Sequence, residues 1–331
     1  MATEPNLMPA LLAPFRIEPR FDYRPWGFRD LRPWFDRAIA AGEQPIGEAW
    51  LTGDANLVAT GPYAGKRLDA VFAEAGFALL GAGAPSTASP LLVKVLFAAD
   101  KLSVQVHPDD KMAQKYGDPR GKTECWYALA AEPGARVALG LKAGVTLEQV
   151  EAEIKDGTLE ASLNALPVEA GDMIFVDAGT VHAIWPGAII METQQNCDLT
   201  YRMFDYGRPR ELHVARSLEA TKLVTRAGKV APIQQNGRTV LIDVEYFRVE
   251  RVPVAESITA EALKVGSQPG LSYLFVAAGS ARIEGDGFDP FDLGPRAIAA
   301  IPAAAPNFTV RNLGGLDLIR ITPNWPQEPS R

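Results

Sequence analysis

Three histidines are present in the 331-residue chain, and two of them stand where predicted strands meet turns. In the segment SVQVHPDD, the two-residue period of a strand places Ser103, Gln105 and His107 on one face and two valines on the other. Buried polar groups without hydrogen-bond partners cost about 1–3 kcal/mol each, so this polar face requires partners. A metal ion would satisfy it, and so would a hydrogen-bonded core.

A carboxylate and a second histidine complete a possible set of metal ligands. In the segment KTECW, Lys122 and Glu124 share a strand face, and His182 follows a tight turn at residues 178–180. Two imidazoles, one carboxylate and one amide oxygen suit a borderline divalent cation such as zinc. Spacing alone leaves the metal site and a hydrogen-bonded core as equal alternatives.

Composition restricts the class of protein. Apolar residues make up 47% and charged residues 22%, which is typical of a globular chain. The net charge of −7 argues against a general nucleic-acid or anionic membrane surface. The N-terminus does not read as a signal peptide, and no apolar stretch is long enough to span a membrane. Cys125 and Cys197 are too few for a disulfide framework, so we expect inert thiols and a cytoplasmic protein of unknown oligomeric state.

Short predicted strands separated by turn signals dominate the chain, which is typical of a sandwich or barrel. A helical insertion near residues 145–165 interrupts them, because Thr146 and Gln149 form a capping box and Gly157 ends the helix. We predict strands over residues 91–98, 102–106, 124–129, 173–176, 188–193 and 199–203, and further helices over residues 68–77, 159–165 and 217–225.

A second all-β unit is predicted from the strands and turns of residues 240–254 and 271–322. Its segment GPRAIAAIPAAAP echoes the earlier AGDMIFVDAGTVHAI but has no histidine, so we interpret it as a degenerate repeat. The predicted domains are residues 1–230, which contain an N-terminal segment and the metal site, and residues 231–331, which lack a metal motif.

Several long segments carry a recognisable pattern: RPWG, IGEAW, LLVKVLFAADKLSVQVHPDD, GKTECWYAL, VEAGDMIFVDAGTVHAI and ETQQNCDLTYRMFDYGR. Together they resemble the type I mannose-6-phosphate isomerase family, whose members are zinc-dependent cupin enzymes. The resemblance is strong over residues 20–220 and weak beyond them. It implies an all-β fold of two cupin-like jelly-roll units with small helical insertions.

The resemblance also implies site residues. One zinc ion per chain would have four ligands: Gln105, His107, Glu124 and His182. Lys122 matches the active-site lysine of the family, and Arg202 matches its catalytic arginine. Ser103 stands where the family places a serine in the substrate pocket, so Ser103, Lys122 and Arg202 are the expected substrate-binding residues.

The implied reaction interconverts mannose 6-phosphate and fructose 6-phosphate, and a proton moves between neighbouring carbons through an enediol. The general base is not identified by the sequence. Two alternatives remain at this point. An oxygen-activating iron cupin would use the same two histidines and glutamate, and a non-catalytic cupin would bind a sugar phosphate without converting it.

Other charged residues allow more than one interpretation. Residues 109–110 follow a proline and are expected to cap a helix. Lys94 lies in an apolar strand, where a pocket and an exposed edge are equally possible. Arg208 and Arg210 could meet a phosphate, although a solvated loop is the simpler interpretation. His213 begins a predicted helix outside every ligand motif.

Overall fold

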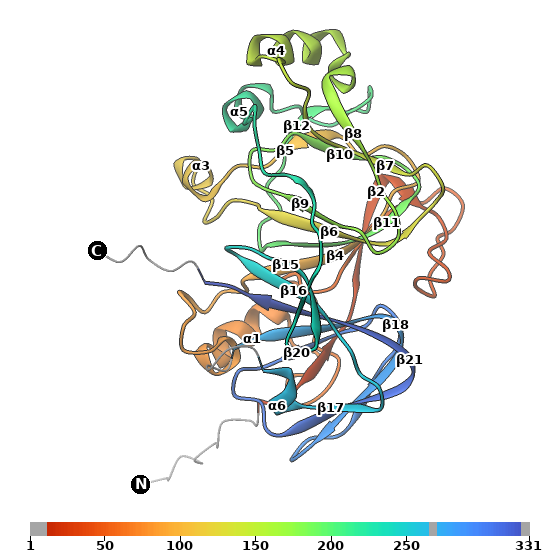
Figure 1. Ribbon diagram of the computed structural model, residues 1–331, viewed down its shortest axis with the longest axis vertical. Helices are drawn as coiled ribbons and strands as arrows, with labels where there is room; N and C mark the ends of the chain where they lie inside the picture. Colours follow the sequence, from red (N-terminus) through yellow and green to blue (C-terminus); the bar gives the residue numbers. More distant parts are fainter. Residues whose placement is uncertain (1–11, 265–269, 326–331) are drawn as a thin grey trace. The chain divides into compact units, whose positions relative to one another are not determined.

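The computed structural model describes residues 12–264 and 270–325, which belong to two compact units. The first β unit comprises residues 20–53 and 90–233, and the second β unit comprises, of the described residues, 12–19, 54–89, 234–264 and 270–325. Strands far outnumber helices in both (Figure 1). No helix among the described residues is long and apolar enough to cross a membrane.

Two antiparallel sheets form the first β unit. The larger sheet contains, in spatial order, β13 (Gly228–Lys229), β9 (Met173–Val176), β6 (Glu124–Ala131), β11 (Ala188–Gln195), β4 (Leu91–Phe97), β3 (Ile46–Trp50) and β2 (Arg20–Phe28). The smaller sheet contains β12 (Tyr201–Phe204), β5 (Val104–Val106), β10 (His182–Ile184), β7 (Arg136–Leu141) and β8 (Leu163–Pro167). Trp126 and Ile190 of the larger sheet share one apolar cluster with Val137 and Ile184 of the smaller sheet. The sheets therefore pack face to face, as in a jelly roll.

Short helices cover the smaller sheet on its other face. They are α3 (Asp110–Lys115), α4 (Leu147–Asp156), the 3₁₀ helix η1 (Leu159–Ser162) and α5 (Val214–Ala220). Val150 and Ile154 of α4 join the apolar cluster that contains Tyr201 and Met203 of β12. Figure 1 shows α4 and α5 beside this sheet.

The predicted ends of the helical insertion are confirmed. The Thr146 hydroxyl accepts a hydrogen bond from the Gln149 amide at 3.2 Å, and Gly157 ends α4 with a left-handed φ of 72°. Two predicted helices differ in extent. The segment predicted as helix 159–165 is only one 3₁₀ turn before β8, and the connector helix spans Val214–Ala220 rather than residues 217–225. Residues 163–167 pair with β7 instead, for example Leu163 with Leu141 and Leu166 with Val137, and this pairing replaces the end of the predicted helix.

One nine-stranded antiparallel sheet, which curls around its own core, forms the second β unit. Its strands are β1 (Phe15–Ile17), β20 (Ile298–Ile301), β18 (Ser272–Gly285), β21 (Phe308–Pro323), β16 (Phe247–Val252), β15 (Arg238–Asp243) and β14 (Ile233–Gln235), with β17 (Ser257–Thr259) on β21 and β19 (Phe291–Leu293) on β18. Its helices are α1 (Leu68–Ala75), α2 (Phe77–Leu80) and α6 (Ala260–Leu263). Leu274, Ile283, Val310 and Leu318 share its apolar core.

The division of the chain differs from the predicted boundary at residue 230. Residues 15–17 pair with β20, and the carbonyl groups of Leu79 and Leu80 accept hydrogen bonds from the backbone of Ala303 and Leu271. These backbone bonds assign residues 12–19 and 54–89 to the second β unit, although the sequence placed them with the metal-binding unit. The separate roles of the two units remain a prediction.

Gly27 marks a close approach between β2 and β3. A Cβ atom built on Gly27 would lie 2.2 Å from the carbonyl carbon of Ile46, so any side chain must push the two strands apart. Gly228 in β13 has no heavy atom within 4 Å of the corresponding position. These two glycines of the first β unit therefore form a matched pair.

We expect Gly27→Ala to lower the free energy of unfolding by about 1–3 kcal/mol, because backbone atoms cannot move aside as a flexible side chain can. Gly228→Ala should change it by less than about 0.5 kcal/mol. Urea unfolding of both variants measures the difference. Equal stability of the two variants would contradict the close approach of β2 and β3.

Candidate metal centre and active-site cavity

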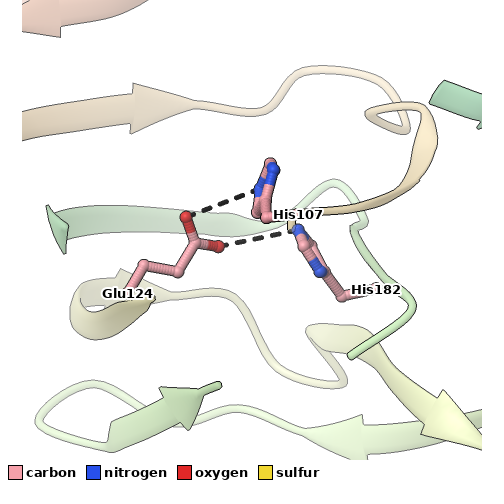
Figure 2. A group of neighbouring side chains, drawn as sticks. All are labelled: His107, Glu124 and His182. Carbon is pink, nitrogen blue, oxygen red and sulfur yellow. Dashed lines mark ion pairs between the residues drawn. The ribbon is translucent and has the colours of Figure 1, made fainter. Parts of the chain in front are cut away.

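Two histidines and one glutamate meet inside the first β unit (Figure 2). His107 follows β5, Glu124 begins β6 and His182 begins β10. Their donor atoms lie within 4.8 Å of one another, and all three side chains are buried. His107 Nε2 is 3.7 Å from one carboxylate oxygen of Glu124, and His182 Nε2 is 3.5 Å from the other. The structure thus brings together three residues that the sequence predicted as one cluster.

Backbone carbonyl groups fix the orientation of both imidazoles. Nδ1 of His107 donates to the Leu199 carbonyl at 2.9 Å, and Nδ1 of His182 donates to the Thr180 carbonyl at 2.9 Å. Because a carbonyl oxygen only accepts, Nδ1 carries the proton and the Nε2 lone pair of each ring faces the cluster. Nε2 of His107 is buried and has no hydrogen-bond partner among the described residues. This is the orientation that metal-binding histidines require.

Burial keeps both imidazoles neutral. It holds the pKa of His107 well below its usual value, and the nearby Lys122 ammonium lowers it further. Burial likewise lowers the pKa of His182 to about 4. At neutral pH both Nε2 atoms therefore offer lone pairs.

Gln105 and Trp126 contact the cluster from two sides. Gln105 lies opposite His182 in the β5–β10 pair, and its amide nitrogen donates to His182 Nε2 at 3.2 Å. The Trp126 indole donates to Glu124 Oε1 at 3.1 Å. The ring holds the glutamate in place, a role that the sequence analysis did not assign to it.

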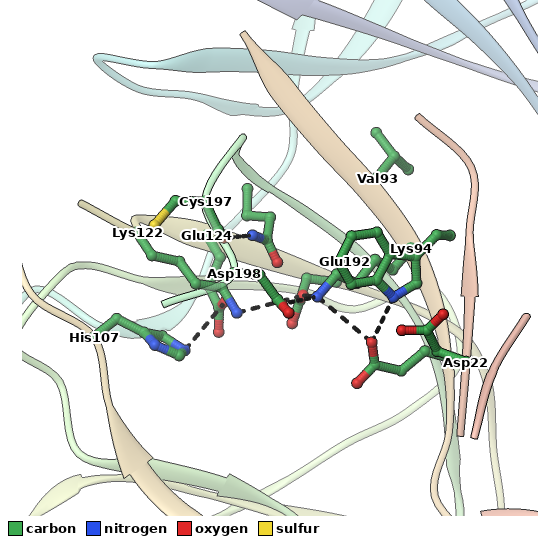
Figure 3. A network of polar contacts seen from close by, with 12 residues as sticks. Asp22, Val93, Lys94, His107, Lys122, Glu124, Glu192, Cys197 and Asp198 are labelled. Carbon is green, nitrogen blue, oxygen red and sulfur yellow. Dashed lines mark hydrogen bonds and ion pairs between the residues drawn. The ribbon is translucent and has the colours of Figure 1, made fainter. Parts of the chain in front are cut away.

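A network of buried charges extends from the cluster (Figure 3). The Lys122 ammonium lies 3.0 Å from Glu124 Oε2 and 3.7 Å from Glu192 Oε1. Lys94, which the sequence could not place, is buried and points into this network, with its ammonium 2.8 Å from Asp198. The two lysines therefore alternate with carboxylates along the network.

The network changes the protonation of its members. Burial alone would lower the pKa of Lys122, but the charges of Glu124 and Glu192 outweigh it and raise this pKa. Burial, together with the negative charge of Glu124, raises the pKa of Glu192 to about 7. Lys122 therefore stays protonated, whereas Glu192 exchanges its proton near neutral pH.

A cavity of about 720 Å³ adjoins the cluster within the first β unit. The predicted substrate-binding residues Ser103, Lys122 and Arg202 all line it, and so does Gln105. Four further cationic side chains line it as well: Arg24, Lys94, Arg208 and Arg210. Its acidic lining residues are Glu48, Glu192 and Asp198.

Arg202 occupies the strand next to the cluster. It lies opposite Gln105 in the β12–β5 pair, and its Nη1 donates to the Glu211 carbonyl at 2.8 Å. Its Nε is buried without a hydrogen-bond partner among the described residues. Burial lowers the pKa of Arg202, and the charge of Arg210 adds to the effect. The guanidinium thus has an unused donor beside the cavity.

Sequence reasoning missed three acidic members of the site. Glu192 directly follows the apolar residues 188–191 of its strand, and a charge that continues such an apolar run is the signal that could have identified it. Glu48 and Asp198 lie in family-like segments, but both become site residues through contacts with Lys94, at 3.6 and 2.8 Å, and Glu48 also pairs with Arg24 at 2.9 Å. Those contacts depend on strand pairing that spacing does not reveal.

The other predicted residues have simple structural roles. Asp109 caps α3 by accepting a hydrogen bond from the Met112 amide at 3.1 Å, as expected. Arg208 and Arg210 both bind Asp205 and line the cavity, so they are not part of a freely solvated loop. His213 lies outside the metal cluster, where its Nδ1 accepts from the Arg202 amide at 3.2 Å.

Both cysteines are free thiols that lie outside the metal cluster. Cys125 is buried, and burial raises the pKa of its thiol. Burial also raises the pKa of Cys197. These thiols are therefore poor nucleophiles, as the sequence analysis expected.

Comparison with known proteins identifies the family. Residues 15–146 match the family described as phosphomannose isomerase type I, catalytic domain. The chain is 34% identical to the mannose-6-phosphate isomerase of Streptococcus mutans over 285 residues, which covers 82% of this chain and 86% of that protein. The chain belongs to the type I phosphomannose isomerase family. The predicted membership and the predicted enzyme class are confirmed.

Two further relatives support this result. A probable mannose-6-phosphate isomerase of Bacillus subtilis is 32% identical over 316 residues, covering 90% of this chain and 96% of that protein. The crystal structure of the Bacillus subtilis mannose 6-phosphate isomerase has a TM-score of 0.81 at 30% identity and covers 93% of this chain and 99% of that one. The expected all-β, cupin-like fold is confirmed.

Lys94→Met tests the buried charge network. Burial alone would raise the pKa of Glu48, but the charges of Lys94 and Arg24 outweigh it and lower this pKa. Removing Lys94 leaves carboxylates without their buried counter-ion, so we expect a loss of about 3 kcal/mol in the free energy of unfolding at pH 7. A lowered carboxylate pKa stabilises the fold above the ordinary pKa, so the deficit should narrow as the pH falls through 4.5.

Lys155→Met is the matched control, because Lys155 pairs with Glu151 on the exposed surface of α4. It should cost less than about 0.5 kcal/mol at every pH. Denaturant unfolding at pH 7, 5 and 4 measures both variants. A Lys94→Met deficit that is constant with pH would contradict the pairing with Glu48.

Proposed function

We propose that this chain is a zinc-dependent isomerase that interconverts mannose 6-phosphate and fructose 6-phosphate through an enediol. The observation that carries the proposal is the cluster of His107, Glu124 and His182, whose lone pairs converge beside a cation-lined cavity. Membership in the type I phosphomannose isomerase family supports the same substrate pair. The reaction needs a site that binds an anionic sugar and moves a proton between neighbouring carbons.

Four residues would hold one zinc ion per chain: Gln105, His107, Glu124 and His182. Two neutral imidazole nitrogens and one carboxylate fit a borderline divalent ion, and the unpartnered Nε2 of His107 supports this fit. Gln105 would add its amide oxygen by turning its amide group over, because its nitrogen now faces His182 Nε2. A bound zinc ion would act as a Lewis acid toward substrate oxygens. Trp126 keeps the Glu124 carboxylate aligned through its indole hydrogen bond.

The remaining cavity residues bind and orient the substrate. Arg202 stabilises the enediolate, because its planar guanidinium can direct two donors at the oxygens where negative charge develops. Lys122 remains protonated and contacts the phosphate or a hydroxyl group of the sugar. Ser103 lines the same cavity and binds substrate beside Lys122.

Proton transfer is supported by the unusual state of Glu192. Its carboxyl group is buried in the cavity lining, with a pKa raised to about 7 by burial and by the charge of Glu124. A group with this pKa can both accept and release a proton at neutral pH, which an enediol mechanism requires. The cavity thus combines anion binding with proton exchange.

The alternative of an oxygen-activating iron cupin uses the same three ligands. The cationic lining of Lys94, Lys122 and Arg202 favours an anionic sugar instead. Metal analysis and oxygen consumption separate the two functions, and turnover of mannose 6-phosphate in a coupled assay separates an enzyme from a sugar-phosphate sensor. The two free thiols support a reducing cytoplasm as the compartment.

His107→Ala and His182→Ala should each reduce zinc content from one ion per chain to nearly none and abolish turnover, while the apolar core keeps the chain folded. A chelator should inactivate the wild type, and added zinc should restore it. His213→Ala, which changes the one histidine outside the cluster, should retain a full equivalent of zinc. Full zinc occupancy and activity in either cluster variant would exclude these ligands.

Arg202→Ala should retain zinc and the fold but lower kcat by about 10²–10³, as for removal of one oxyanion donor. Arg202→Lys should recover only part of this loss, because an ammonium group cannot reproduce the planar fork. Arg226→Ala, at an exposed arginine outside the cavity, should match the wild type. If Arg202→Ala turns over within about fivefold of the wild type, the arginine is structural.

A further inference from the structure

The second β unit has a cavity of its own, of about 270 Å³, at one end of its inner face. Strands β16, β21 and β18 lie side by side (Figure 1), and Arg248, Arg320 and Ser272 of these strands line the cavity. In their register, Glu250 and Leu274 flank Arg320, and Arg248 lies opposite Thr322. Directly opposed residues share one face of a sheet, so the charged residues continue the face that carries the apolar core.

Three arginines surround a single buried glutamate at this end of the core. Nε of Arg320 donates to Glu250 Oε2 at 3.1 Å, and its Nη2 contacts the same oxygen. Nε of Arg248 donates to Glu250 Oε1 at 2.8 Å, and Arg238 lies 3.6 Å from Oε2. The side chains of Arg320 and Glu250 are only 2% and 1% exposed. Both charges have therefore lost nearly all of their hydration.

Stability alone does not account for this buried pair. Desolvation of two charges offsets most of their attraction, and apolar residues of similar volume usually stabilise a core equally well or better. Burial lowers the pKa of Arg320 to about 10 despite the contact with Glu250, which reflects this desolvation. Burial of the Arg320 guanidinium is unfavourable, and Arg320 lines a cavity. A ligand that enters the cavity and binds this guanidinium would give the buried charge a function.

Two polar groups at the cavity have unused hydrogen-bonding capacity. Both hydrogen bonds of Arg320 use Nε and Nη2, so Nη1 has no partner among the described residues. The hydroxyl of Thr322 is buried and also unpartnered within the described part of the chain. Arg320 and Thr322 both line the cavity. They are two residues apart in β21, so their side chains lie on the same face of the strand.

The charges of the side chains around Glu250 indicate that a ligand in this cavity would carry one negative charge. Arg238, Arg248 and Arg320 carry three positive charges, and Glu250 and Asp243 carry two negative charges, so one positive charge is left over. Lys264 at the cavity edge is already paired with Glu261 at 2.5 Å. The rest of the lining is largely apolar and includes Leu80, Leu263, Leu271, Ile301 and Phe308.

We propose that this cavity binds a small organic carboxylate, whose oxygens accept hydrogen bonds from Arg320 Nη1 and Thr322 Oγ1 and whose apolar body contacts the aliphatic and aromatic lining. A planar carboxylate matches the guanidinium fork, and its single charge matches the excess of one. Inorganic phosphate has no apolar body and carries more charge, so it fits less well. The site is distinct from the catalytic cavity, because every residue that lines it belongs to the second β unit.

Titration calorimetry of the full-length chain with benzoate tests this site, with benzamide as the uncharged analogue and inorganic phosphate as the anion without an apolar body. We expect benzoate to bind in the millimolar range or tighter and benzamide at least about tenfold more weakly. Any phosphate binding should be unchanged by substitutions in the second β unit, because it would occur at the cation-lined cavity of the first β unit. No heat of binding for benzoate up to about 10 mM would overturn the proposal. Equal binding of benzoate and benzamide would overturn it as well.

Variants locate the binding within the second β unit. The double variant Glu250→Leu/Arg320→Met replaces the ion pair by apolar residues, so it should stay folded by circular dichroism and lose benzoate binding. Thr322→Val is nearly isosteric and should keep the unfolding midpoint while weakening benzoate by about tenfold. Arg282→Met, at an exposed arginine paired with Asp292, should bind as the wild type does. Benzoate binding unchanged in both Thr322→Val and the folded double variant would place the ligand elsewhere and refute the proposal.

Discussion

The first β unit depends on the balance of charges that burial has separated from water. An isolated buried carboxylate or ammonium group is very costly, and four of the charged side chains around the cavity are almost completely buried: Glu48, Lys94, Lys122 and Glu192. Strand pairing solves this problem by placing Glu192 opposite Lys94 on adjacent strands, with Glu48 on the next strand. The positions of the strands therefore determine the protonation states, and these determine which chemistry the cavity can perform.

Local pattern placed the residues of the His107–Glu124–His182 cluster on strand faces and at a turn, but it did not decide between a metal site and a hydrogen-bonded core. The two-residue strand period places Gln105 and His107 on one face, and the turn before His182 directs its ring without help from distant residues. The carbonyl group that orients the His182 ring is local, at Thr180, whereas the one that orients the His107 ring belongs to Leu199, 92 residues away, and no local pattern identifies it. Spacing along one strand identifies side chains that share a face. The groups that fix the tautomer and charge of the His107 ring come from other parts of the chain.

The strands were predictable from local sequence pattern as well. The division of the chain into two units was harder to predict. Alternating apolar positions predicted most of the strands and both β units, and the cap at Thr146 fixed one end of α4. The segment of residues 54–89 gave no sign of its partner, since its place depends on backbone hydrogen bonds from distant residues, among them Leu271, Ala303 and Ala304. Contacts between segments distant in sequence leave little trace in the composition of either segment.

The 3.0 Å contact between Lys122 and Glu124 bears on how the metal-free protein folds. Lys122 supplies a built-in cation beside the carboxylate, so the newly folded apo-protein carries no unbalanced negative charge at its centre. Folding then has no need to wait for metal, unlike that of a zinc finger. Binding of the proposed metal would then be a separate, later step, in which the incoming ion competes with the Lys122 ammonium group for the same Glu124 oxygen.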